Sequence, residues 1–282
     1  MRVYIILFIF FISISCNREL AVKSISVDDY ALLDSVFASK KSNVEGTIAP
    51  VFVENISPGI KELSVKDRKE IFIKFLMPVV LRSNETILSK RNRIIDIYER
   101  YNDNRVVSGE ELLWIDDLSE IYRTGEKDFD ALLKKVDMIP PSLIIAQAIV
   151  ESGWGTSRFA IEGNSLFGEH FSNGAEGSFI SANNSDIKLR TFESIEKAVD
   201  RYCINLNRHR AYKEFREKRF ISRQSSLKPS SIELAEALGS YSEKGSEYII
   251  NLKQIIRKNS LQIIDDIILE KKGVEYRVLV KS

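Results

Sequence analysis

The stretch PSLIIAQAIVESGWG, residues 141–155, decides the fold of this chain. From Leu143 to Val150 the side chains are apolar on nearly all sides, which predicts a helix buried inside a domain. Pro141 suits the first turn of that helix because its missing N–H would have no partner there. Gly153 and Gly155 permit the left-handed backbone with which many helices end. The stretch therefore predicts a buried helix that is closed by a tight turn at its two glycines.

Glu151 is a carboxylic acid at the end of this apolar helix, close to the negative end of the helix dipole. Burial and the dipole both oppose ionisation, so we expect its pKa to lie above the reference value of about 4.3. A carboxylic acid that stays protonated near neutral pH is what glycoside hydrolysis needs to protonate the leaving oxygen. The alternative is an ion pair, for which Arg158 is the nearest candidate.

A second element, NSLFG at residues 164–168, begins thirteen residues after Glu151. Together with ESGWG at 151–155, it resembles the bacterial glucosaminidase family of cell-wall hydrolases, which includes autolysins, the flagellar rod-cap hydrolase and the Bax proteins. Ser165 stands where the family has Asn directly before Leu. Similarity to the Bax subgroup extends over residues 50–258, through FLMPVV at 75–80, NRI at 92–94, NRHRAY at 207–212 and YS at 241–242.

The resemblance implies a mainly α (α+β), lysozyme-like glucosaminidase fold with a small β-hairpin lobe and an N-terminal helical region. It also implies an endo-β-N-acetylglucosaminidase that cleaves β-1,4 bonds in peptidoglycan glycan strands without a cofactor, with Glu151 as general acid. We expect a signal peptide with lipobox over residues 1–16, a helical region over 17–130, the catalytic domain over 131–265 and a tail over 266–282.

The sequence leaves the identity of a second catalytic carboxylate open. An inverting glycosidase needs a general base about 6.5–9.5 Å from the acid, and a retaining one needs a nucleophile at about 5–5.5 Å. Glu169, Glu176 and Asp186 are the candidates, because they lie in or near the expected hairpin. Each could equally be a solvated turn charge. Alternatively, the 2-acetamido group of the substrate assists, and Glu151 is then the only essential carboxylate.

Candidates for substrate binding are Trp154, Asn164, Phe167, Gly168, Tyr202 and Tyr241. Aromatic faces can pack against the C–H surface of a sugar ring, but core packing is the alternative for these aromatic residues and for Tyr212. Asn164 and Gly168 shape the floor of a cleft or are turn residues. Tyr241 matches the site tyrosine of the family, so the resemblance favours substrate contact there.

Composition excludes several partner classes. The 41 basic and 40 acidic side chains nearly cancel, which gives no long-range attraction to nucleic acid. His170 and His209 lack metal-ligand spacing, so neither a metal nor a cofactor is expected. Cys203 lies in a helical stretch and is expected to be a small core residue rather than a nucleophile. We expect a monomer whose partner is peptidoglycan.

The N-terminal sequence is typical of an export signal. Arg2 precedes the apolar run from Val3 to Ile12, which is too short to span a bilayer but suits a signal peptide. Ser15 directly before Cys16 resembles the lipobox of bacterial lipoproteins, although Ser13 replaces the usual Leu. We expect a lipid-anchored protein that faces the periplasm and cell wall, with simple secretion and an uncleaved anchor as alternatives.

Local patterns predict further elements. Residues 26–130 read as helical, with a kink or an end at Pro78 and a second helix over 84–101. Further helices are predicted near 109–123, 127–137, 194–208, 231–239 and 246–258, a hairpin between 178 and 192, and a strand at 274–278. Two rival functions stay open at this stage: a lytic transglycosylase, and a wall-binding lipoprotein without turnover.

Overall fold

The computed structural model describes residues 21–42, 44–171, 176–181, 187–241, 245–271 and 273–281. The expected signal peptide with Cys16, and the candidate carboxylate Asp186, lie outside these residues.

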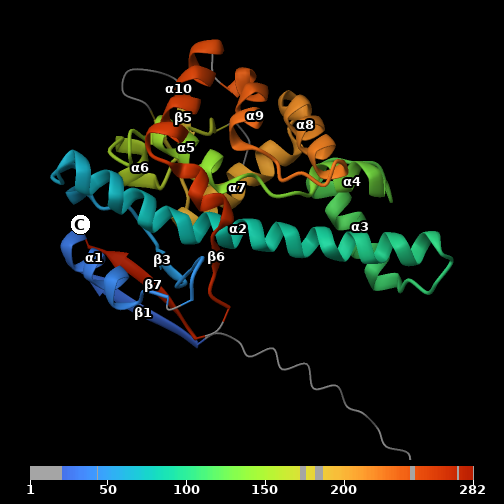
Figure 1. Ribbon diagram of the computed structural model, residues 1–282, viewed down its shortest axis with the longest axis horizontal. Coiled ribbons are helices and arrows are strands. Elements are labelled where there is room, and N and C mark those ends of the chain that lie inside the picture. The colour runs from blue at the N-terminus through green and yellow to red at the C-terminus, as the bar shows by residue number, and fades with distance from the viewer. Residues whose placement is uncertain are drawn as a thin grey trace, which may run out of the picture.

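The longest element is α2 (Val65–Asn102), a helix of 38 residues that runs across the whole molecule (Figure 1). Its N-cap is Ser64, whose side chain accepts a hydrogen bond from the backbone N–H of Asp67. The prediction of an end at Pro78 is wrong, because α2 continues through this buried residue. Fully buried apolar side chains precede and follow it on the same stripe, and their burial offsets the backbone hydrogen bond that proline cannot make.

A parallel sheet of three strands, in the order β1-β7-β3, packs beside α1 and α2. It contains β1 (Ala21–Val27), β3 (Val51–Val53) and β7 (Val274–Val280). Val278 of β7 is the register partner of Ile25 in β1 and of Val53 in β3. The strand predicted near the C-terminus is therefore confirmed, and it is the centre of a sheet.

The sheet corrects the prediction that residues 26–130 are helical throughout. Only α1 (Tyr30–Ser39) precedes the strands β2 (Thr47–Ile48) and β3, and β2 pairs with β6 (Ile268–Leu269). The strands at this end of the chain find their partners more than two hundred residues away. Such pairings leave no trace in local periodicity, because the parallel partner lies across the entire helical body.

A layer of helices covers the other side of α2 (Figure 1). Its α-helices are α4 (Phe129–Lys135), α5 (Pro141–Ser152), α6 (Arg158–Gly163), α7 (Ile195–Arg208), α8 (Lys213–Gln224), α9 (Ser231–Ala235) and α10 (Ser246–Lys258). Helix α3 (Gly109–Tyr122) lies beside α2 and packs against α4 and α7. Short 3-10 helices are η1 (Pro58–Lys61), η2 (Arg210–Tyr212), η3 (Glu236–Tyr241) and η4 (Leu261–Asp266). As predicted, α5 is buried: it packs against α2, α9, α10 and η4. Helix α8 was not predicted from the sequence.

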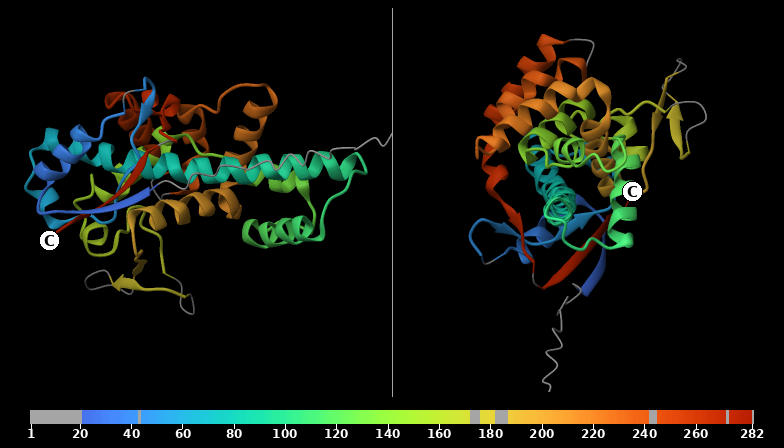
Figure 2. Two further views of the ribbon diagram at one scale, coloured as in Figure 1. Left: turned by 90° about the horizontal axis from the view of Figure 1, so that it is seen from below. Right: turned by 90° about the vertical axis from the view of Figure 1, so that its right-hand side faces the viewer.

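A small hairpin projects from the helical body (Figure 2). Strands β4 (Phe179–Ser181) and β5 (Lys188–Arg190) pair antiparallel, with Ile180 opposite Leu189. The predicted architecture, mainly helical with a hairpin lobe, is confirmed. Within the described part of the chain, no helix is both long and apolar enough to cross a membrane.

Candidate active site

Glu151 is the second-last residue of helix α5, which ends at Ser152 in a tight turn. Gly153, Trp154 and Gly155 all have positive φ, of 58°, 61° and 76°. The Ser152 hydroxyl accepts a hydrogen bond from the N–H of Gly155 at 2.9 Å, which closes the turn. A Cβ at residue 155 would come within 3.0–3.1 Å of Phe72 and Ile60, so only glycine allows this turn to pack against α2.

Glu151 faces a pocket of about 290 Å³. The pocket is lined by Glu151, Phe167, Gly168, Glu169, His170, Phe192, Ala198, Tyr202, Asn205, Tyr212 and Tyr241. The ESGWG and NSLFG elements meet here: a Cβ at residue 168 would lie 4.0 Å from Oε2 of Glu151. Gly168 has φ +64°, a conformation that glycine adopts without strain. The backbone of the second element can therefore pass directly beside the carboxyl group.

Burial raises the pKa of Glu151, and a hydrogen bond from Tyr248 lowers it by a smaller amount. The direction agrees with the expectation from the sequence. The alternative of an ion pair with Arg158 is not found, because the Arg158 guanidinium binds Glu162 at 3.3 Å and the Ser181 carbonyl. Among the residues that the structure describes, no cation forms an ion pair with Glu151. The carboxyl group is thus held in a setting that favours its protonated form.

A series of hydrogen-bonded polar side chains leads to the Glu151 carboxyl group. Gln147 lies one helical turn before it and donates from Nε2 to the Tyr248 hydroxyl at 2.8 Å. Tyr248 donates in turn to Glu151, and the Tyr202 hydroxyl donates to Oε1 of Gln147. Tyr248 belongs to α10 and Tyr202 to α7, so three helices converge on this chain.

Sequence reasoning missed Gln147 and the polar role of Tyr248. Gln147 is fully buried in a helix that is otherwise apolar, and a lone amide in such a run was the signal that could have found it. Tyr248 falls within the helix predicted near 246–258, where core packing is the ordinary role of an aromatic residue. Its ring does lie in the core, at 4% exposure, but its hydroxyl reaches the carboxyl group.

Three of the aromatic candidates, Phe167, Tyr202 and Tyr241, line the pocket. Phe167 and Tyr202 stack with ring centroids 4.0 Å apart, and Tyr241 stacks on Tyr248 at 5.6 Å. The Tyr241 hydroxyl donates to the Phe167 carbonyl at 3.0 Å, which ties η3 to the NSLFG element. Tyr212 packs at 6.1 Å from Tyr241 and also lines the pocket.

The candidates for the second carboxylate are placed differently. Glu169 lines the same pocket as Glu151, and its carboxylate pairs with Arg201 at 2.9 Å and with Arg190 at 3.3 Å. Glu176 is exposed at the base of the hairpin, where its backbone carbonyl accepts a hydrogen bond from Arg190. Only Glu169 is therefore brought to the pocket of Glu151 among the described candidates.

Trp154 and Asn164 do not line this pocket. The Trp154 ring packs edge-on against Phe72 at 6.1 Å, and the ammonium group of Lys69 lies 5.1 Å from its centre. Asn164 ends α6 with φ 52° and donates to the Phe192 carbonyl at 3.1 Å. Cys203 is a buried core residue, as predicted, and burial raises the pKa of its thiol. The described residues contain no group of side chains that could hold a metal ion.

The site is thus a buried carboxylic acid in a pocket of a mainly helical domain with a hairpin lobe. A model of the glucosaminidase family, described as mannosyl-glycoprotein endo-beta-N-acetylglucosaminidase, matches residues 126–261. This match over residues 126–261 confirms the resemblance that the sequence motifs indicate.

Protein bax of Escherichia coli strain K12 is 31% identical over 190 residues, which are 64% of this chain and 66% of that protein. The chain thus spans just under two thirds of that relative. A peptidoglycan hydrolase from Sphingomonas sp. A1 is 21% identical, with a TM-score of 0.36 over 48% of this chain and 84% of that one. A glycoside hydrolase domain of FlgJ from Salmonella typhimurium is 20% identical, with a TM-score of 0.34 over 51% and 97%.

Proposed function

We propose that the chain is an endo-β-N-acetylglucosaminidase that cleaves β-1,4 bonds of peptidoglycan, with Glu151 as general acid. The observation that carries the proposal is the position of Glu151: a carboxyl group whose pKa is raised by burial, in a pocket walled by aromatic side chains. The match of residues 126–261 to the glucosaminidase family model supports the same reaction. The N-terminal sequence supports export, with lipid attachment at Cys16.

In the proposed reaction Glu151 transfers its proton to the glycosidic oxygen as the C1–O bond breaks. The anion left behind on Glu151 then accepts the hydrogen bond from Tyr248. Because Gln147 fixes the Tyr248 hydroxyl, this donor is in place before the charge develops. Water ultimately attacks C1 and leaves a new reducing end on N-acetylglucosamine.

Two routes supply the attack at C1. Glu169 could activate the water, but its carboxylate is engaged by two guanidinium groups. Those ion pairs favour the second route, in which the 2-acetamido group of the substrate attacks C1 and water opens the resulting ring. Under this route Glu151 is the only carboxylate that the chemistry requires.

The decisive experiment digests purified sacculi with the protein and analyses the products by mass spectrometry after borohydride reduction. Hydrolysis at N-acetylglucosamine gives reduced N-acetylglucosaminitol ends. A lytic transglycosylase is the second candidate, favoured by the lack of a free second carboxylate at Glu169, and it would give 1,6-anhydro ends that borohydride does not reduce. Sacculi that remain undigested in every preparation would favour a wall-binding protein without turnover.

A further inference from the structure

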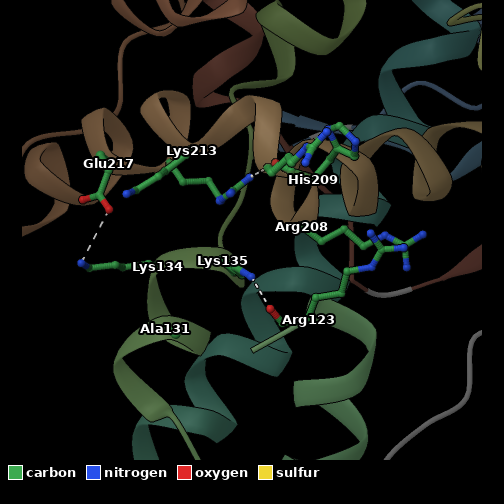
Figure 3. Close-up of a pocket in the computed structure, with 10 residues that line it drawn as sticks. Arg123, Ala131, Lys134, Lys135, Arg208, His209, Lys213 and Glu217 are labelled. Carbon is green, nitrogen blue, oxygen red and sulfur yellow. Dashed lines mark hydrogen bonds and ion pairs between the residues drawn. The ribbon is translucent and has the colours of Figure 1, made fainter. Parts of the chain in front are cut away.

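A basic pocket of about 700 Å³ lies between α4 and α8, beside the loop after α3 (Figure 3). Its cationic lining includes Arg123, Lys134, Lys135, Arg208, Lys213 and Arg216. In Figure 3, Lys134 and Lys135 come from α4 on one side, and Lys213 comes from α8 on the other. Arg210 also lines the pocket, and Glu217 is the only carboxylate among the described residues that line it.

The positive charge of this pocket is largely uncompensated. Among the described residues, Lys134 is the only one of these cations with an ion-pair partner, Glu217 at 3.7 Å. Lys135 donates to the carbonyls of Tyr122 and Arg123 at 2.8 and 2.6 Å, so its partners are neutral backbone groups and not an anion. The whole sequence has almost equal numbers of acidic and basic residues. The lining of this pocket, in contrast, is strongly positive.

The cations also repel one another. Burial lowers the pKa of Arg208, and repulsion from Arg201 and Arg123 lowers it further. Burial together with repulsion from Arg216 acts in the same way on Lys135. Arg216 is only 6% exposed, and its guanidinium group donates to two backbone carbonyls. A bound anion would relieve this repulsion, and the planar guanidinium groups suit a carboxylate.

Residues that are close together in the sequence line the basic pocket and the pocket of Glu151. On α7, Asn205 lines the Glu151 pocket, and Arg208, less than one helical turn further on, lines the basic pocket. Where η2 meets α8, the same change occurs between consecutive residues: Tyr212 lines the Glu151 pocket and Lys213 lines the basic pocket. A branched ligand held at Glu151 could therefore place a side branch in the basic pocket.

We propose that the basic pocket binds the carboxylates of the peptide stems that branch from peptidoglycan glycan strands. This assignment rests on the proposed function, because it takes peptidoglycan as the ligand of the Glu151 pocket. The N-acetylated sugars of the strand carry no charge, whereas the stems carry free carboxylates. A glycan strand bound at Glu151 therefore carries its negative charge on the stems that branch from its side. The basic pocket is large enough for several residues of peptide.

The test compares binding of two soluble ligands: glycan strands that carry their stems, and strands from which an amidase has removed them. All proteins carry Glu151→Gln, so that neither ligand is digested. The pocket variant is Arg123→Gln/Arg210→Gln/Lys213→Gln, whose three sites are exposed. The control variant, Lys23→Gln/Arg257→Gln/Lys258→Gln, loses the same charge at exposed positions outside the pocket.

We expect the pocket variant to bind stem-bearing strands at least about tenfold more weakly than the control does, with a reduced salt dependence. The two variants should bind stem-free strands alike. Methyl esterification of the stem carboxylates should weaken binding of the control to the level of the pocket variant.

Equal binding of stem-bearing strands by both variants would overturn the assignment. So would a loss that is equally large on stem-free strands, since the cations would then contact the sugars. A wild-type protein that digests sacculi while its pocket variant shows no binding defect would leave the proposed function intact and sink only the stem-binding pocket. If the protein has no hydrolytic activity but still prefers stem-bearing strands through the basic pocket, the proposed function is wrong and the stem-binding pocket stands.

Discussion

Gln147 and Tyr248 join α5 to α10 through a hydrogen bond of 2.8 Å between the side-chain amide and the phenol hydroxyl. Gln147 is fully buried and Tyr248 is 4% exposed, so water does not compete for this bond. The bond fixes the hydroxyl that donates to Glu151. The position of the general acid is thereby tied to the packing of two helices that are about a hundred residues apart in the chain.

Tyr248→Phe should therefore change the pH dependence of activity. The Tyr248 hydrogen bond lowers the pKa of Glu151, so its loss raises that pKa further. Because the acid must be protonated, activity falls as pH rises through its pKa, and the alkaline limb of the pH–rate profile should move to higher pH. The unpaired Gln147 amide should also cost about 1–3 kcal/mol of stability.

Tyr98→Phe is the matched control for this variant, because the half-buried Tyr98 ring stacks on Phe129 away from the site. Activity against sacculi across a pH series, together with urea unfolding, measures both effects. A Tyr248→Phe profile that superimposes on those of the wild type and of Tyr98→Phe would show that the hydroxyl does not act on Glu151.

Tyr241→Phe removes the hydroxyl that donates to the Phe167 carbonyl. We expect turnover to fall, because this bond holds the NSLFG element beside Glu151. The lost hydrogen bond should cost about 0.5–1.5 kcal/mol, so the melting temperature should drop by only a few degrees. Initial rates and thermal unfolding check the two expectations. A large loss of stability with normal turnover would assign Tyr241 to the core alone.

The central helix and the position of its acid could be predicted because their signals are local. The apolar run, Pro141 at the start and Gly153 at the end mark the bounds of α5 within fifteen residues of sequence. The ESGWG and NSLFG elements are also local, and the first of them predicts the acid at the end of α5. The close approach of Gly168 to the Glu151 carboxyl group was not predicted and is seen only in the structure.

Other features depend on distant partners and carry no local signal. Helix α8 was missed because its buried face includes Arg216 and Arg219, and a charged residue normally marks a solvated face. The fully buried Arg219 guanidinium is matched by the Asn207 side chain at 2.7 Å and by Asp137 nearby. Only the tertiary structure brings these groups together, and the same is true of the basic pocket beside α8.

Cys16→Ala tests the proposed lipid anchor. The apolar run from Val3 to Ile12 and the small Ser15 predict cleavage before Cys16, followed by acylation of its thiol. Metabolic labelling with a fatty-acid probe should mark the wild type in the membrane fraction, and it should not mark Cys16→Ala. Cys203→Ala is the control, because that buried thiol is not available to an acyltransferase and labelling should persist. Label retained by Cys16→Ala would disprove the anchor.

Glu151→Gln removes the transferable proton and keeps the shape of the side chain. Activity should fall by at least about 10²–10⁴-fold, the loss typical of a missing general acid. Burial raises the pKa of Glu151 in the folded protein, so ionisation above that pKa costs stability that the neutral amide does not lose. The variant should therefore be as stable as the wild type or slightly more stable near neutral pH. That difference should disappear in acid, where Glu151 is protonated in both the folded and the unfolded state. Urea unfolding at two pH values and product release from sacculi give both answers, with Glu233→Gln on the exposed face of α9 as control. A Glu151→Gln protein that digests sacculi at a near-normal rate would refute the mechanism.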